Sequence, residues 1–221
     1  MKQSFLILTL LIIITSCDFS VNVNTPENNE IDFGKMPEVK ASTFNNIQVI
    51  DENYCEKYDY SLTRFAIEYP DNVEVKLHED EFSYMSIKVR ENGEIIEEMS
   101  IGSTTLNIPM KSKSMELLEM LIPEFEAQIE SLTTDFIGKS NFKNKMEYQF
   151  NGHADYSDFK EMGYDGKYRM IMMIPFPENN QKLKAVLVSF VANEKSGIKS
   201  YKDFQDKGVI AKIWETFRYI E

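Results

Sequence analysis

Two residues of one predicted strand have side chains that can bind a metal ion. His153 and Asp155 are two positions apart in a segment that we predict to be a strand over 145–156, so both side chains project from the same face. A catalytic zinc ion needs three protein ligands and a structural one needs four, and the chain has only two histidines and two cysteines. We therefore expect no metal ligand, and we keep a metal-assisted hydrolase that uses His153 and Asp155 as an alternative function.

Two groups of carboxylates are further candidates for acid–base chemistry. They are residues 78–81 (His-Glu-Asp-Glu) and the pair Glu97-Glu98. Paired carboxylates can act as acid and base only where their surroundings separate the two pKa values, and these groups lie in polar stretches, so we expect a solvated rim. The sequence also contains no Gly-x-Ser-x-Gly elbow, phosphate-binding loop or dinucleotide fingerprint. We therefore expect no catalytic residue and no cofactor-binding residue.

A further group of candidate residues is apolar. Tyr156, Phe159, Met162 and Tyr164 lie in a loop-like stretch between two predicted strands. Aromatic and methionine side chains suit irregular surfaces, so this stretch either packs onto the core or forms an exposed surface for a peptide or an apolar ligand. Cys55 has no basic neighbour in the sequence that would stabilise a thiolate, and we interpret it as a structural or incidental cysteine.

The N-terminus carries the most specific signal in the chain. A basic start is followed by an apolar run over 5–14, which is too short for the roughly 20 residues of a membrane-spanning helix and typical of a secretory signal peptide. The run ends in Ile14-Thr15-Ser16-Cys17, which resembles a bacterial lipobox. That resemblance implies that residues 1–16 are removed and that Cys17 receives a diacylglyceryl group and usually an acyl group on its amine. Two or more acyl chains anchor a protein stably in a membrane.

The charge of the chain limits its partners. It has 24 Lys+Arg against 36 Asp+Glu, a formal net charge of −12, and because Lys2 is the only charged residue of the signal peptide, cleavage changes this to −13. Such an acidic chain lacks the clustered cations that nucleic-acid binding requires. Residues 17–46 show no helical or strand period and contain Pro26 and Pro37, so we predict a flexible, disordered tether there. The tether has no basic cluster, so the lipid on Cys17 must hold the protein at the membrane.

The folded domain is predicted over 47–221 and is rich in strands. We expect strands over 60–69, 136–140, 145–156, 168–176 and 183–191, and a hairpin of 84–89 with 94–104 that turns at Asn92-Gly93, the residues a type I′ turn favours. Residues 170–174 (Met-Ile-Met-Met-Ile) are apolar on both faces, which predicts a central strand covered above and below.

Two helices are predicted between and after these strands. The first begins at Ser114, contains Pro123 and presents one apolar stripe, formed by Met115, Leu118, Ile122, Phe125, Ile129 and Leu132. The second closes the chain over 199–219, with Gly208 as a point of interruption. Runs of strands separated by few helices favour an α+β fold with an antiparallel sheet.

Three short motifs resemble the PsbP-like superfamily, which includes the photosystem II extrinsic protein, Ran-binding Mog-type proteins and bacterial DcrB-type lipoproteins. They are residues 65–70 (Phe-Ala-Ile-Glu-Tyr-Pro), 151–154 (Asn-Gly-His-Ala) and 216–218 (Thr-Phe-Arg); Val73 stands where the family usually has a tryptophan. The resemblance implies an α/β/α sandwich, in which helices flank an antiparallel sheet, that serves as a binding or assembly module without catalytic residues.

Together these patterns predict a lipoprotein of the bacterial cell envelope that faces the periplasm or the cell surface. Its domain would bind another envelope protein or assist assembly, and an acidic surface suits a basic partner. An immunity or chaperone lipoprotein is an alternative in the same class, and the metal-assisted hydrolase is the alternative in a different class.

Mass spectrometry of the mature N-terminus tests the lipobox directly. We expect the mature chain to begin at Cys17 and to carry the mass of a diacylglyceryl group, with or without an acylated amine. A mature N-terminus with an unmodified Cys17 would exclude lipid anchoring.

Overall fold

The computed structural model describes residues 44–79, 82–104, 114–143, 145–177 and 183–220. The predicted signal peptide, Cys17 and the tether up to residue 43 lie outside the described residues, as do Asp80 and Glu81. Within the described ranges, no helix has the length and apolar character needed to cross a membrane.

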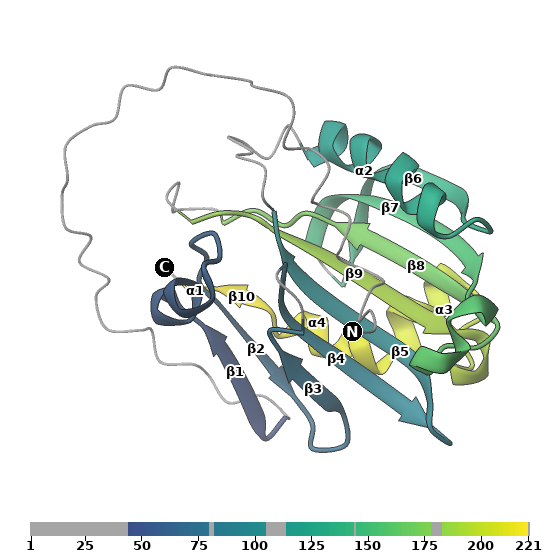
Figure 1. Cartoon of the computed structure of the whole chain (residues 1–221), viewed down its shortest axis with the longest axis horizontal. Coiled ribbons are helices and arrows are strands. Elements are labelled where there is room, and N and C mark those ends of the chain that lie inside the picture. The colour runs from purple at the N-terminus through teal and green to yellow at the C-terminus, as the bar shows by residue number, and fades with distance from the viewer. Residues whose placement is uncertain (1–43, 80–81, 105–113, 144, 178–182, 221) are drawn as a thin grey trace.

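The domain is an α+β fold built on two antiparallel sheets (Figure 1). A three-stranded sheet has the order β1-β2-β10, and a seven-stranded sheet has the order β3-β4-β5-β9-β8-β7-β6. The strands are β1 (Asn46–Ile50), β2 (Phe65–Tyr69), β3 (Glu74–Leu77), β4 (Ser83–Glu91), β5 (Glu94–Ser103), β6 (Thr133–Phe142), β7 (Lys145–Asp155), β8 (Lys167–Met173), β9 (Val186–Asn193) and β10 (Arg218–Tyr219). The helices are α1 (Glu52–Tyr58), α2 (Ser114–Gln128), α3 (Tyr201–Lys207) and α4 (Val209–Glu215), with 3-10 turns η3 (Ser157–Met162) and η4 (Glu194–Ser196).

The hairpin that the sequence predicts is confirmed. β4 and β5 pair antiparallel, and the two residues between them, Asn92 and Gly93, have φ angles of 51° and 87°. Both values lie in the left-handed region that a type I′ turn requires at its two central positions. The turn at Asn92 and Gly93 therefore helps to set the register of β4 against β5.

The two faces of the seven-stranded sheet support two separate apolar cores. On β8, Ile171 and Met173 belong to one core, and Met170 and Met172 belong to the other, so the predicted central strand is confirmed as buried on both faces. Helices α3 and α4 contribute to the first core, and α2 contributes to the second, on the opposite side of the sheet in Figure 1. Residues of α2 therefore belong to one core, and residues of α3 and α4 share the other.

Both predicted helices form, with corrections. The buried stripe of α2 is centred on Leu117, Leu118, Leu121 and Phe125, and Pro123 lies inside the helix as expected. The closing helix is two short helices, because Gly208 between them has φ −56° and ψ 133°, which is not helical. A Cβ at Gly208 would lie 2.7 Å from the carbonyl oxygen of Phe204, so the break is packed tightly.

Three elements near the N-terminal end of the domain were not predicted: β1, α1 and β3. β1 begins at Asn46, the last residue of the predicted tether, and Phe44 packs against the first core. The strand predicted over 60–69 is limited to Phe65–Tyr69, which pairs with both β1 and β10.

A partly buried lysine of β7 holds the end of α4. Lys145, at the start of β7, donates hydrogen bonds to the carbonyl oxygens of Trp214 (3.0 Å) and Phe217 (2.6 Å) at the end of α4. Its ammonium nitrogen lies 4.2 Å from the ring centroid of Trp214, the only tryptophan of the chain. Burial lowers the pKa of Lys145 to about 7, and the nearby Glu147 and Glu215 carboxylates only partly oppose this.

The lowered pKa of Lys145 predicts a stability that rises with pH. Above about pH 7 the folded chain releases the Lys145 proton while the unfolded chain keeps it. Each further unit of pH therefore favours folding until the pH reaches 10.5, the ordinary pKa of a lysine side chain. Relative to Lys145→Met, the wild type should gain about 1 kcal/mol or more in unfolding free energy from about pH 7 to about pH 9. Urea unfolding at each pH measures the gain, and Trp214 fluorescence should titrate over the same range in the wild type only. An unfolding free energy that changes equally in both proteins would contradict the assignment.

Candidate functional site

The structure separates the two residues of the predicted metal pair. The His153 ring nitrogen Nδ1 lies 2.9 Å from Asp135 Oδ2, and that oxygen also accepts a hydrogen bond from the Tyr201 hydroxyl (2.6 Å). Asp155 instead accepts hydrogen bonds at Oδ1 from the backbone N–H and the hydroxyl of Ser157. Among the described residues, no group of three or more His, Cys, Asp or Glu side chains is placed to hold a metal ion. His153 and Asp155 thus have separate structural partners.

Glu97 and Glu98 do not form the solvated rim that the sequence predicts. Each side chain belongs to a residue only 3% exposed, and the two point to opposite faces of β5. Glu97 accepts the backbone N–H of Ile210 (3.0 Å) in the first turn of α4. Burial raises the pKa of both carboxyl groups. Their partners come from distant parts of the chain, which a reading of neighbouring residues does not reveal.

Glu98 is the inner end of a polar network on the face that α2 covers. It accepts a short hydrogen bond from the Tyr164 hydroxyl, and its Oε1 lies 3.6 Å from Lys88 Nζ. Lys88 donates to Glu79 Oε1 (2.7 Å), whose other oxygen accepts from Ser86 (2.7 Å). Burial alone would raise the pKa of Glu79, but the hydrogen bonds from Lys88 and Ser86 outweigh it and lower that pKa. Lys88 and Glu79 therefore form a close ion pair, and Lys88 also contacts the more deeply buried Glu98.

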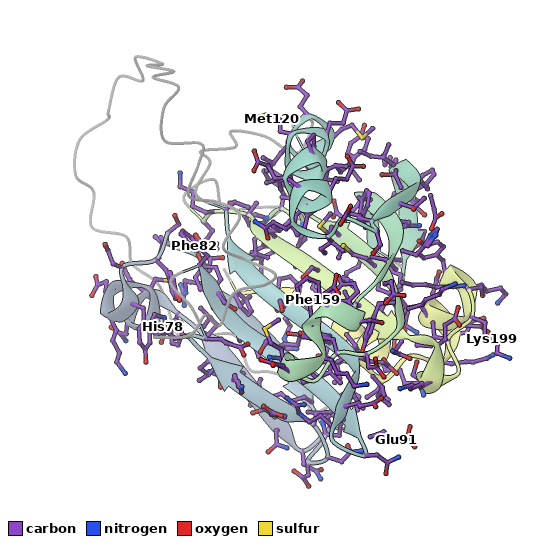
Figure 2. All side chains as sticks on the ribbon, turned by 45° about the vertical axis from the view of Figure 1, so that its right-hand side comes forward. His78, Phe82, Glu91, Met120, Phe159 and Lys199 are labelled. Carbon is purple, nitrogen blue, oxygen red and sulfur yellow. The ribbon has the colours of Figure 1, made fainter. Side chains whose placement is uncertain are left out.

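The predicted apolar loop packs onto the core instead of forming an exposed surface. Tyr156 is 0% exposed and Tyr164 is 5% exposed, while Phe159 and Met162 are partly buried against the second core. Figure 2 shows Phe159 on η3, in front of the sheet. The Ile95 N–H donates to the Gly163 carbonyl (2.7 Å) and fastens the end of this loop to β5. These contacts cover most of the aromatic and methionine side chains of the loop.

Cys55 is buried in the first core. It is 2% exposed, and its thiol donates to the Thr63 carbonyl oxygen (3.5 Å). Burial raises its pKa, which keeps the thiol protonated and unreactive near neutral pH. A structural role, as the sequence predicts, fits these contacts.

A partly exposed group of aromatic residues that was not predicted lies around α1. Helix α1 is short, but both of its ends are capped: Asp51 accepts the Tyr54 N–H at the first end, and Asp59 adopts the left-handed conformation at the other. Tyr54 and Tyr58, one turn apart, project from one face of the helix. The next tyrosine along the chain, Tyr60, and His78 at the end of β3 complete the group.

We call Tyr54, Tyr58, Tyr60 and His78 the α1 aromatic surface. The Tyr58 ring stacks on the His78 ring with a centroid separation of 4.1 Å, and its centroid lies 4.8 Å from that of Tyr54. The tyrosines are partly exposed and His78 is exposed. Figure 2 places His78 beside α1, and Lys199 on the opposite side of the molecule. The surface is therefore remote from α3.

The backbone of β4 holds this surface in place. The Tyr84 carbonyl accepts the Tyr54 hydroxyl (2.7 Å) and the His78 N–H (3.2 Å). The Tyr60 hydroxyl donates to the Ser83 carbonyl (2.9 Å) and lies 2.5 Å from His78 Nδ1. Burial raises the pKa of Tyr54 to about 12, so its hydroxyl remains a donor. Two of the three hydroxyl groups are thus tied to the backbone of β4.

Neither a protein-family model nor a curated protein matches the chain. The assignment of a functional surface therefore depends on geometry. The α1 aromatic surface combines the partly exposed rings of three tyrosines with the exposed ring of His78. The sequence signal that would have indicated it is the close spacing of Tyr54, Tyr58 and Tyr60.

The polar network makes a specific stability prediction. Lys88→Met leaves Glu98 buried without its nearest cation and should lower the free energy of unfolding by about 3 kcal/mol at neutral pH. Lys88→Met/Glu98→Gln removes the stranded carboxylate as well and should be more stable than Lys88→Met alone. Urea unfolding of the three proteins measures both effects. A double variant less stable than the single one would show that Glu98 is not held by Lys88.

Proposed function

We propose that this chain is a lipid-anchored, non-catalytic protein of the bacterial cell envelope that binds another envelope protein through the α1 aromatic surface. The Cys17 lipobox supports the anchor, and the tether after it would place the domain away from the bilayer. The chemistry of the surface supports binding, because side chains that are partly exposed and already ordered lose little conformational entropy when a partner covers them.

The observation that carries the proposal is the group of partly exposed rings at Tyr54, Tyr58 and His78. Tyrosine is enriched among the residues that contribute most to protein–protein affinity, since it offers a large rigid area with few rotatable bonds. Here the hydroxyl of Tyr54 is bound to Tyr84 of β4, so the ring has a fixed orientation before any partner arrives. An aromatic surface with fixed rings binds a protein partner at a lower entropic cost than a surface with mobile rings.

We further propose that the domain is an α/β/α sandwich of the PsbP-like kind. This is supported by the contribution of α2 to one core of the seven-stranded sheet and of α3 and α4 to the other. In that family the sandwich serves as a binding or assembly module, which agrees with the absence of a predicted catalytic residue from the sequence.

Site-specific crosslinking in cells tests the binding function. A photo-crosslinking amino acid at Asn53, an exposed position of α1, should give one discrete crosslinked species, whereas the same probe at Lys202, an exposed position of α3, should not. Tyr58→Leu should reduce the yield at Asn53 about fivefold or more, because the ring contributes on the order of 1 kcal/mol to the contact. Equal patterns from Asn53 and Lys202, or a yield unaffected by Tyr58→Leu, would count against the α1 aromatic surface as the binding site.

A further inference from the structure

We propose that the α1 aromatic surface binds a lysine or arginine side chain from a basic segment of its partner, and that this cation takes the position over Tyr58 that Lys57 occupies in the free protein. The inference rests on the proposed function, since it names the chemistry of the partner at the same surface.

The first argument is that Tyr58 already holds a cation. Lys57 Nζ lies 4.7 Å from the centroid of the Tyr58 ring, within the distance at which a ring face attracts a positive charge. Lys57 is exposed, so this contact is weak and its flexible side chain can move away at little cost. The ring face of Tyr58 is thus a cation site with a replaceable occupant.

The second argument comes from the hydroxyl groups. The Tyr54 and Tyr60 hydroxyls donate to the carbonyl oxygens of Tyr84 and Ser83, which directs these donors into the protein. An incoming group therefore meets the faces and edges of the rings, whose faces carry partial negative charge. Such a surface offers little to an anionic ligand and favours a cation.

The third argument is the charge around the helix. Helix α1 and its two cap residues contain four carboxylates, Asp51, Glu52, Glu56 and Asp59, against the single lysine Lys57. The whole chain has a formal net charge of −12, so the long-range field also attracts a basic partner. Because the Asp51 carboxylate caps the helix at the Tyr54 N–H, the outer carboxylates Glu56 and Asp59, which are exposed, are the ones that a partner would meet.

A binding measurement on the mature lipoprotein in detergent tests the inference. The probe is a fluorescein-labelled tetra-arginine peptide, and its neutral match is the same peptide with citrulline in place of arginine. We expect the tetra-arginine peptide to bind at least about tenfold more tightly than the citrulline peptide, as measured by fluorescence anisotropy. Equal affinity for the two peptides would overturn the inference.

Two lysine variants distinguish the contribution of the Tyr58 ring to peptide binding from that of the overall charge. Lys57→Met and Lys202→Met each remove one positive charge from an exposed helix position, but only Lys57→Met uncovers the Tyr58 ring. Lys57→Met should bind tetra-arginine about threefold or more tightly than Lys202→Met does. If the two variants bind equally, general charge attraction explains the binding and the ring has no part in it.

The Tyr58 ring itself is tested with a conservative pair. Tyr58→Phe keeps the ring and should bind tetra-arginine as the wild type does, whereas Tyr58→Leu should bind it about fivefold more weakly. If Tyr58→Leu does not fold, the comparison of Lys57→Met with Lys202→Met decides. A partner captured at Asn53 in cells without any preference for arginine over citrulline would leave the proposed function in place and refute only the basic segment.

Discussion

The fold depends on covering both apolar faces of one seven-stranded antiparallel sheet. Apolar side chains alternate between the two faces of β8 and β9, and either face left in water would cost more than the marginal stability of a domain. Residues of α2 belong to the core on one face, and residues of α3, α4 and the small three-stranded sheet belong to the core on the other. Two other features place α3 and α4 against the sheet. The chain breaks at Gly208 between the two helices, and Lys145 donates a hydrogen bond to the Trp214 carbonyl in α4.

Features set by neighbouring residues could be predicted from the sequence. The turn at Asn92-Gly93, the central strand around Ile171 and the α+β class all follow from local pattern. The burial of Glu98 could not be predicted, since it is held by Lys88 on the next strand and by Tyr164 from another part of the chain. The pairing of β1 with β2 is equally non-local, because helix α1 lies between the two strands in the sequence.

The α1 aromatic surface was missed for the same reason. Tyr58 and His78 are 20 positions apart, and the bonds of Tyr54 and His78 to the Tyr84 carbonyl bring the end of β3 against α1. His78 also has a φ angle of 51°, a left-handed conformation that few residues other than glycine adopt and that no sequence pattern indicated. A strained residue at an exposed aromatic group agrees with a binding role, since strain is retained mainly where the surroundings or function require it.

The outer strand β6 has a consequence for proteins held on a membrane. It is ten residues long and mostly exposed, and the row of backbone groups along such an edge can pair with any extended chain. Copies anchored in one bilayer would meet far more often than copies in solution. The charged side chains of Asp135 and Lys139 and the bulge next to Phe136 interrupt the edge, and the acidic charge of each copy repels the next. Under the lipid anchor that we propose, these features would oppose edge-to-edge aggregation between neighbouring copies.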